Sequence, residues 1–582
     1  MSRLSEKADS NESTKSSWLT HTTSAWKEAP GYTADPVDLD KLDVEFGPRP
    51  PDSFTIDYLA RVGVSAMGFP WKVVQHYGDA TKMVYRARER QLKTLCTEFL
   101  GPLPHPLNIN RIVLIRGDDS SSPETLSAQS RNVDVLEISG PKELCTLDET
   151  VWTDDTVIAY IPLGATSLKE VPTISRQNTW RLIEIMKFAV NHPVVFKVFV
   201  LTTNVIGADS FSALAQAPLV GHSRVITGEH PEHFGGLFDC EDHTIPLTAV
   251  KYIQAADVVR ILDGVPRTAR LRSLPKNIRS EQVSRSFPRA EGTYLISGGL
   301  GPLGLATTEF LAGHGARRLV LISRRAVPPR RSWPTVDPSS DPIIDKLQQL
   351  EKQGVSFHNL SLDITGPDAS TKLLTELDRL NLPPVLGVVH AAGVLENEMI
   401  LDCTQDAFDR VLSPKIDGAL ALHHAFPPGT VDFFMMFSSC GQLFGFPGQG
   451  SYGSGNAFLD GLATYRRKLG DNARSFQWSS WRGMGMGSDS EFVAAELESK
   501  GITDITRDEA FQAWLHLAEY DIDHGVVLRS RTISADKPLP AGLLRDIISR
   551  SAPEQGSGSA PSQPTSSDSI PPPGPELNSY LD

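Results

Sequence analysis

Short apolar runs separated by longer amphipathic stretches recur along most of this chain. The runs RIVLIRG (111–117), TVIAYI (156–161) and VVFKVFVLTT (194–203) have the length and β-branched content of buried strands. The segment between the last two, SRQNTWRLIEIMKFAVNH, has helical periodicity. Strands that alternate with helices predict an α/β fold with a parallel sheet.

A second alternating series begins at Tyr294 and includes RRLVLIS (317–323), VLGVVHAAG (385–393) and VDFFMMFSS (431–439). A chain of 582 residues has room for two or three domains. We therefore predict two Rossmann-like, doubly wound units in tandem, over residues 105–285 and 286–535.

The composition changes outside these two units. Residues 1–36 are polar, and residues 536–582 are rich in Ser, Pro and Gly, so we expect both to be disordered tails. Residues 37–104 contain an apolar helical pattern that begins at Asp79. We interpret them as a small structured extension that serves in docking or in oligomerisation.

The two units differ after their first strand. The first has GDDSSSP, where Asp118 and Asp119 would repel a pyrophosphate, so we expect a structural half that binds no dinucleotide. The second has SGGLGPLG (297–304), the form of a dinucleotide-binding turn before a helix. Glycine spacing alone also fits an ordinary tight turn. The residues that we assign to phosphate binding are Gly298, Gly301, Leu303 and Gly304.

The ends of the following strands suggest which dinucleotide is bound. An arginine pair in Ser323-Arg324-Arg325 suits the 2′-phosphate of NADPH, where an NAD enzyme usually has an acid. A solvated basic loop is the alternative. Further contacts to the cofactor are expected from Asp363, Ile364, Ala391, Ala392 and Gly393.

Four residues form a candidate catalytic set, namely Lys415, Ser439, Tyr452 and Asn456. Tyr452 and Asn456 are four residues apart and share one face of a helix that we expect to start at the tyrosine. A phenol with a pKa of about 10 is a poor acid unless its anion is stabilised, and the ammonium of Lys415 can stabilise it. Ser439, at a strand end, can hold a substrate carbonyl oxygen.

Composition narrows the possible partners and compartment. The net charge of −14 argues against general binding to nucleic acid or to anionic membranes. The chain has no apolar run of the ~18 residues that cross a bilayer, and its first residues lack the apolar core of a signal peptide. Five widely spaced cysteines predict neither a disulfide framework nor a metal site. We expect a cytoplasmic protein.

Several stretches together resemble the ketoreductase domain of modular and fungal iterative type I polyketide synthases, of the methylsalicylic-acid type, within the short-chain dehydrogenase/reductase superfamily. In the second unit they are SGGLGPLG, SRR, VVHAAGVL, PKIDGALALH, FFMMFSSCGQLFGFPGQGSYGSGNAFLDGLA and WSSWRGMGMG. In the first unit, ALAQAPLVGHSRVITGEHPEHFGGLFD (213–239) resembles the structural subdomain of such enzymes. The resemblance covers residues 105–535.

The resemblance implies a role for each residue of the set. Tyr452 would donate a proton, Lys415 would lower the pKa of that tyrosine, and Ser439 would bind the carbonyl. Asn456 would support the proton relay, and NADPH would supply the hydride. The family's stereochemical fingerprint reads Leu395-Glu396-Asn397 here, with Phe444 at the tryptophan position, which favours the B-type product.

The 582 residues show no ketosynthase cysteine region, no acyltransferase serine elbow and no carrier-domain serine motif. We therefore expect a stand-alone, trans-acting NADPH-dependent β-ketoreductase. Its substrate would be a polyketide bound to the carrier domain of a separate, non-reducing synthase, with aromatic lactones of the hydroxymellein type as a product class. The alternatives are reduction of a free small ketone and an inert scaffold for a synthase, against which the intact catalytic set argues.

Docking to an acidic carrier domain would need a local basic patch on this acidic protein. The basic clusters are Arg466-Arg467-Lys468 and Arg330-Arg331, and solvated surface charge is the alternative for each. The extension over residues 37–104 would make a second contact, with the synthase, with the first unit or with another copy of the chain.

Overall fold

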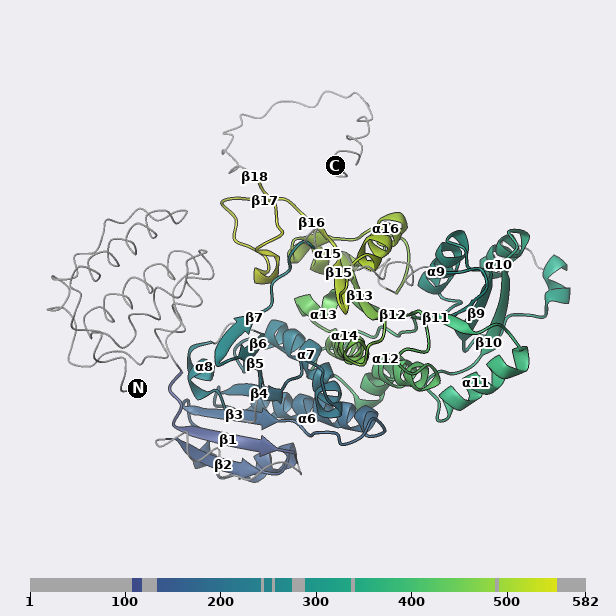
Figure 1. Ribbon diagram of the computed structural model, residues 1–582. Helices are drawn as coiled ribbons and strands as arrows, with labels where there is room; N and C mark the ends of the chain where they lie inside the picture. The colour runs from purple at the N-terminus through teal and green to yellow at the C-terminus, as the bar shows by residue number, and fades with distance from the viewer. Residues whose placement is uncertain are drawn as a thin grey trace, which may run out of the picture.

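A computed structural model describes residues 107–117, 133–241, 245–253, 257–274, 288–335, 341–486 and 491–551. Each half of this region contains one seven-stranded sheet (Figure 1). The extension predicted over residues 37–104 lies outside the described residues, as do Asp118 and Asp119.

The first sheet has the strand order β2-β1-β3-β4-β5-β6-β7 and is parallel apart from the hairpin of β6 and β7. Its strands are nearly continuous apolar runs because helices cover both faces, and all seven residues of β5 are buried. The strands are β1 (Arg111–Arg116), β2 (Asp134–Ile138), β3 (Thr156–Ile161), β4 (Lys197–Thr203), β5 (Phe234–Cys240), β6 (Val258–Leu262) and β7 (Val265–Thr268), and the main helices are α6 (Val171–Asn191), α7 (Phe211–Glu229) and α8 (Leu247–Tyr252).

The second sheet is parallel throughout, with the order β10-β9-β8-β11-β12-β13-β15. In chain order this is the doubly wound arrangement, whose strand order reverses between β8 and β11, where ligands bind beyond the carboxyl ends. The tandem α/β prediction is therefore confirmed. The strands are β8 (Thr293–Ser297), β9 (Arg318–Ser323), β10 (Ser356–Ser361), β11 (Val385–His390), β12 (Phe433–Ser439), β13 (Ala473–Trp478) and β15 (His524–Val527), and the helices are α9 (Pro302–Gly313), α10 (Pro342–Lys352), α11 (Ala369–Leu380), α12 (Gln405–Ala425), α13 (Gly441–Phe444), α14 (Gly450–Lys468), α15 (Glu491–Ser499) and α16 (Arg507–Ala518).

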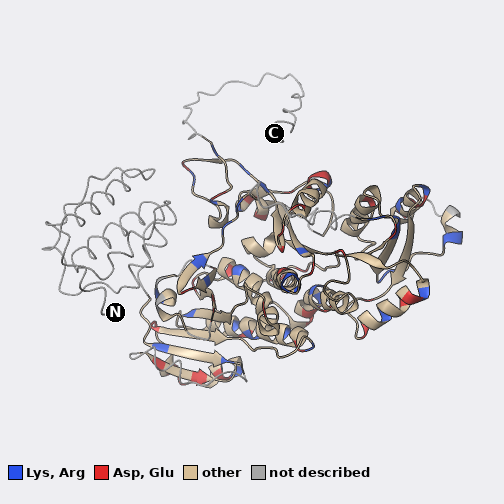
Figure 2. Cartoon of the chain, in the orientation of Figure 1, with Lys and Arg blue, Asp and Glu red and all other residues tan. Residues whose placement is uncertain are grey.

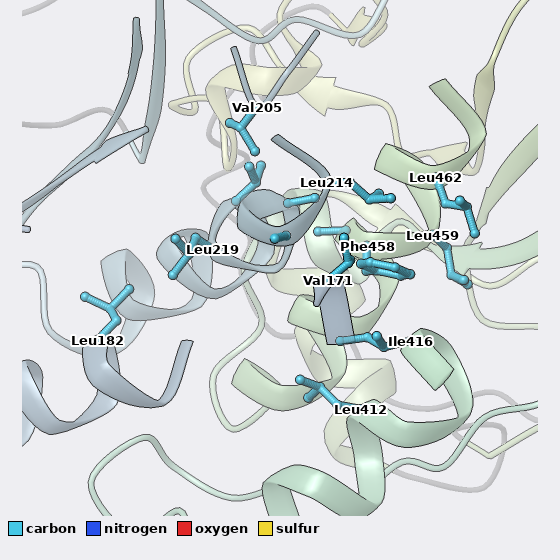
Figure 3. Packing of buried hydrophobic residues seen from close by; sticks show 14 of the residues in the cluster. Val171, Leu182, Val205, Leu214, Leu219, Leu412, Ile416, Phe458, Leu459 and Leu462 are labelled. Carbon is cyan, nitrogen blue, oxygen red and sulfur yellow. The ribbon is translucent and has the colours of Figure 1, made fainter. Parts of the chain in front are cut away.

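The two halves share one hydrophobic core. Helices α7 and α14 lie side by side at the boundary (Figure 1). Figure 3 shows Val171, Leu214 and Leu219 of the first half in the same buried cluster as Leu412 and Phe458 of the second. Because apolar side chains of both halves are buried against each other, the first half supports the second and is not a separate body.

The prediction of a disordered tail over residues 536–582 is wrong for residues 536–551, which are ordered. Strand β17 (Ile533–Ser534) pairs with β18 (Arg550–Ser551), and between them Leu544 is fully buried. The carbonyl of Leu543 accepts a 2.9 Å hydrogen bond from the backbone of Leu271. The prediction followed the high Ser and Pro content of residues 536–582 and overlooked the apolar residues of AGLLRDIIS (541–549), which pack into a hydrophobic cluster.

The cluster 466–468 is also not the basic surface patch that we predicted. Arg466 has the same helical phase as Leu462 and Leu459, so it points inward and its side chain is 0% exposed. It pairs with Asp471 at 2.6 Å and lies 3.8 Å from the ring centre of Phe434.

The other candidate patch is partly engaged as well, since Arg330 pairs with Glu351 at 2.7 Å. Figure 2 shows basic and acidic positions interspersed over the described elements. None of the helices in the described ranges is both long and apolar enough to span a bilayer.

Candidate functional site

The glycine-rich turn lies between β8 and α9, at the carboxyl edge of the second sheet. Gly298 has φ +71°, and a Cβ there would lie 2.8 Å from the backbone nitrogen of Ala392. A Cβ on Gly304 would lie 2.2 Å from the carbonyl oxygen of Gly298. Helix α9 begins at Pro302, with Gly301 as its N-cap and no side-chain hydrogen bond at that cap. The backbone N–H groups of the first turn of α9 can therefore bind a phosphate.

The turn after β9 contains the two candidate arginines, and the structure separates them. Arg325 forms an ion pair with Asp341 at 2.6 Å. Arg324 is exposed and has no ion-pair partner within the described ranges. Ser323 donates to the carbonyl of Arg325 at 2.7 Å, and Ser361 donates to that of Arg324 at 3.1 Å, which fixes the turn. Of the two guanidinium groups, that of Arg324 is the one available to a 2′-phosphate.

Asp363 and Ile364 follow β10 at the same edge. The backbone N–H and the hydroxyl of Thr365 both donate to Asp363, and the backbone bond is the larger cause of its lowered pKa. Ile364 is 7% exposed and packs against Gly418 of α12. Of Asp363 and Ile364, only Asp363 has a polar side chain that could bind a nucleotide.

A cavity of about 110 Å³ lies beyond the carboxyl ends of β11 and β12, beside α14. Side chains from three separate elements meet in it: Lys415 of α12, Ser439 of β12 and Tyr452 of α14. Three residues that we assigned to the cofactor also line it, namely Leu303, Ala391 and Gly393. The cavity therefore joins the predicted catalytic residues to the predicted cofactor residues.

Tyr452 lies in the first turn of α14. Burial raises the pKa of its phenol above 10, and hydrogen bonds with the side chains of Asn456 and Ser439 oppose this rise. The phenol is therefore protonated at neutral pH and can act as a proton donor. Its anion would need a positive charge nearby.

Lys415 can supply that charge. Its side chain is buried, and Nζ donates to the carbonyl of Phe437 at 2.7 Å. Burial lowers the pKa of Lys415 to about 8, while the charge of Asp460 acts in the opposite direction. Glycine at positions 393 and 455 leaves room for the lysine, since a Cβ at either would lie 3.0–3.1 Å from its side chain.

His390, at the end of β11, holds this part of α12 in place. Its Nε2 lies 2.9 Å from the carbonyl oxygen of Pro414, so Nε2 carries a proton and donates it. Nδ1 then accepts from the hydroxyl of Ser297 at 2.6 Å. Burial and the nearby Lys415 lower the pKa of His390 to about 3, so the ring is neutral. His390 therefore links Pro414, the residue before Lys415, to Ser297 of β8.

Ser439 and Asn456 complete the set in different ways. The hydroxyl oxygen of Ser439 accepts a hydrogen bond from the backbone of Gly441 at 3.1 Å, so its own proton can be donated to the phenol of Tyr452 or to a substrate oxygen. Asn456 is fully buried behind the tyrosine, and its Nδ2 donates to the carbonyl of Tyr452 at 2.8 Å. Asn456 therefore supports the helix rather than facing the cavity.

Several residues that line the cavity were not among those predicted from the sequence, namely Phe446, Gln449, Trp481, Met484 and Leu497. Gln449 precedes Tyr452 by three residues and is only 5% exposed, and this helical spacing could have identified it. Leu497 comes from α15, and no local pattern in the sequence indicates that this helix reaches the cavity.

Comparisons with known proteins agree with this geometry. Residues 292–483 match the family model described as the KR domain. All of the chain aligns, with 43% identity, to the 6-methylsalicylic acid synthase of Penicillium patulum, and 95% of it aligns, with 36% identity, to the mellein synthase of Phaeosphaeria nodorum. It spans 39% and 37% of the length of these relatives.

Among solved structures, an A-type ketoreductase from a modular polyketide synthase superposes with a TM-score of 0.60 at 24% identity. That alignment covers 76% of this chain and 96% of the other, which supports the fold. The family match and the aligned synthases together identify the chemistry. The chain therefore belongs to the ketoreductase domains of polyketide synthases, which are oxidoreductases.

Proposed function

We propose that the protein reduces a β-ketone of a polyketide intermediate with NADPH as the hydride donor. The observation that carries this proposal is the meeting of Lys415, Ser439 and Tyr452 in one cavity. At the same edge of the sheet, helix α9 has no side-chain hydrogen bond at its N-cap. Arg324 lies there too and has no ion-pair partner among the described residues. The glycine-rich turn suits the pyrophosphate of a dinucleotide, and the arginine suits the 2′-phosphate on its adenosine ribose.

The residues of the cavity divide the reaction between them. Ser439 donates a hydrogen bond to the ketone oxygen and fixes its position. Tyr452 donates its proton to that oxygen as the alkoxide develops, and the charge of Lys415 stabilises the phenolate that remains. NADPH, when bound, supplies the hydride to the carbonyl carbon. The fixed Pro414–His390 contact keeps the lysine in register with the tyrosine.

The presentation of the substrate is part of the proposal. The relatives are named as synthases of 6-methylsalicylic acid and mellein, which supports a polyketide held on an acyl carrier domain. We propose that a separate, non-reducing synthase supplies this carrier. The apolar side chains of Leu395, Phe446 and Leu497 line the cavity and suit a short acyl chain. A reductase of free small ketones is the second candidate, and the apolar side chains that line the cavity also suit that class.

Oxidation of NADPH should be followed with three substrates: a decalone, a β-ketoacyl N-acetylcysteamine thioester and the same acyl group on a carrier domain. The proposal predicts the highest kcat/KM for the carrier-bound chain. Equal values for all three would favour the free-ketone reductase, and no oxidation with any of them would refute the reductase. Tyr452→Phe serves as the inactive control.

The partnership needs a second assay. Incubation with a non-reducing synthase, malonyl-CoA and NADPH should give a product that carries two more hydrogen atoms than the product without the reductase, as mass spectrometry can show. An unchanged product would contradict the trans-acting proposal. Chiral analysis of the alcohol tests the B-type prediction, and an L-configured product would contradict it.

A further inference from the structure

Glu229 is the last residue of α7, and its carboxylate reaches two loops of the second half. One oxygen, Oε1, accepts a hydrogen bond from the backbone N–H of Gly448 at 2.8 Å. The other, Oε2, accepts a hydrogen bond from the backbone N–H of Ile400 at 2.9 Å. A single side chain of the cofactor-free half therefore holds two segments of the catalytic half that are far apart in the sequence.

The two loops also contact each other. The backbone N–H of Glu398 donates to the carbonyl of Gly448 at 2.9 Å, and Glu398 forms an isolated parallel bridge with Gln449. Gly448 has φ +77°, a conformation that favours glycine, and a Cβ there would lie 3.7 Å from the side chain of Asn397. Each loop is therefore bonded both to the other loop and to Glu229.

The end of α7 lies directly against the loop that leads into α14. A Cβ on Gly228 would lie 3.0 Å from the carbonyl oxygen of Gly445, and a Cβ on Gly445 would lie only 2.3 Å from that of Arg224. A carboxylate at the last residue of a helix meets the negative end of the helix dipole, so Glu229 does not stabilise α7 itself. Burial raises the pKa of Glu229, and its two backbone bonds oppose that rise. The bonds to the two loops are what this side chain contributes.

Both loops contribute side chains to the active-site cavity. Leu395 belongs to the loop that follows β11, whereas Phe446 and Gln449 belong to the segment that leads into α14 and Tyr452. A ketone has two faces, and the way in which it lies among these side chains decides which face meets the hydride. The position of one loop relative to the other therefore bears on the selectivity of reduction as well as on its rate.

We propose that Glu229 is a positioning residue, which fixes the loop after β11 relative to the start of α14 and thereby controls which face of the ketone is reduced. This inference rests on the proposed reductase function and deepens it. The cofactor-free half then takes part in the stereochemistry of the product, through two hydrogen bonds at the end of one helix. Neither bond involves a residue that we assign to the cofactor, so NADPH binding should not depend on Glu229.

Glu229→Gln is the informative variant, because it changes the hydrogen bonds with almost no change in size. The amide oxygen can accept from one of the two backbone N–H groups, whereas the amide nitrogen has only protons to offer and leaves the other loop without its bond. Asp239→Asn is the matched control. Asp239 of β5 also accepts from two backbone N–H groups, those of Val205 at 2.7 Å and Ile206 at 3.0 Å, but all three residues belong to the first half.

The measurements are steady-state kinetics and chiral analysis of the alcohol, with NADPH and a β-ketoacyl N-acetylcysteamine thioester. With Glu229→Gln, the ratio of the major to the minor alcohol should fall by about fivefold or more, as the loss of one hydrogen bond to a charged group allows. KM for the ketone should rise more than kcat falls, and the dissociation constant of NADPH should stay within about twofold of the wild type. Asp239→Asn should lower thermal stability and leave the ratio of the alcohols unchanged.

An unchanged ratio in a folded Glu229→Gln enzyme would overturn the proposal, as would an equal fall with Asp239→Asn. If Glu229→Gln does not fold, amide hydrogen exchange of the wild type tests the same contacts. The amides of Ile400 and Gly448 should be protected, and exchange as fast as in an unfolded peptide would overturn the proposal. A wild-type enzyme that reduces no ketone would refute the proposed function itself, and the exchange of these two amides distinguishes that failure from a failure of the contacts.

Discussion

Gly221 of α7 and Gly453 of α14 bring the backbones of the two halves into direct contact. A Cβ on Gly221 would lie only 2.2 Å from the carbonyl oxygen of Gly453. Gly453 directly follows Tyr452, so the position of the catalytic phenol along α14 is set partly by a helix of the cofactor-free half. Further along the same pair, a Cβ on Gly461 would lie 2.9 Å from the side chain of Ala217.

Gly221→Ala should push the two helices apart. Overpacking of this kind costs about 1–3 kcal/mol of unfolding free energy, and the displaced tyrosine should lower kcat as well. Gly313→Ala is the control, since a Cβ there meets nothing within 4 Å. Thermal unfolding and steady-state kinetics of both variants check the prediction, which an unaltered Gly221→Ala enzyme would contradict.

Arg324 and Arg325 should differ in their effect on cofactor choice. Arg324→Glu should erode the preference for NADPH over NADH, because it replaces the available guanidinium with a repelling acid. Arg325→Glu should act mainly through its lost pair with Asp341 and should change the preference less. The ratio of kcat/KM for the two cofactors measures this, and equal use of both by the wild type would show that the assignment is wrong.

Tyr452→Phe should abolish reduction and leave NADPH binding nearly intact, because the phenol donates a proton but contributes little to holding the nucleotide. Binding can be followed by quenching of tryptophan fluorescence. Turnover within tenfold of the wild type, a barrier change below about 1.4 kcal/mol, would mean that another group is the acid.

The pH dependence of reduction should reflect the lowered pKa of Lys415. The ammonium is present below its pKa of about 8 and is lost above it, so kcat/KM should fall as the pH rises through that value. A kcat/KM that stays constant up to about pH 10 would contradict the assignment of this role to the lysine.

The pair of Arg466 and Asp471 should be structural. Both side chains are 0% exposed, and His423 accepts a further bond from the arginine at 2.9 Å. Asp471→Asn leaves a buried charge without its partner and should cost about 3–5 kcal/mol of unfolding free energy. Lys468→Ala, at an exposed position of the same helix, should stay within about 0.5 kcal/mol of the wild type. Denaturant unfolding of both variants tests this.

Local sequence was sufficient for the strands, because apolar runs are local features, and it placed Ser439 at a strand end and Tyr452 at the start of a helix. It was not sufficient for Arg466, whose direction depends on the phase of α14 and on Asp471 after the helix. Nor could it show that Arg325 is paired, since Asp341 lies sixteen residues further on. Leu497 reaches the cavity through tertiary packing, which no local pattern encodes, whereas the spacing of Gln449 to Tyr452 is a local signal.

The shared core also determines how this reductase could be transplanted. A piece cut at residue 286, where the second unit was predicted to begin, would lose α7 and uncover the side of α14 that packs on it, including Ala457 and Gly461. A newly exposed apolar surface of that kind favours aggregation. Anyone who grafts this activity into another synthase should therefore move the strands from β1 onward as one piece, and should treat the cofactor-free half as part of the enzyme.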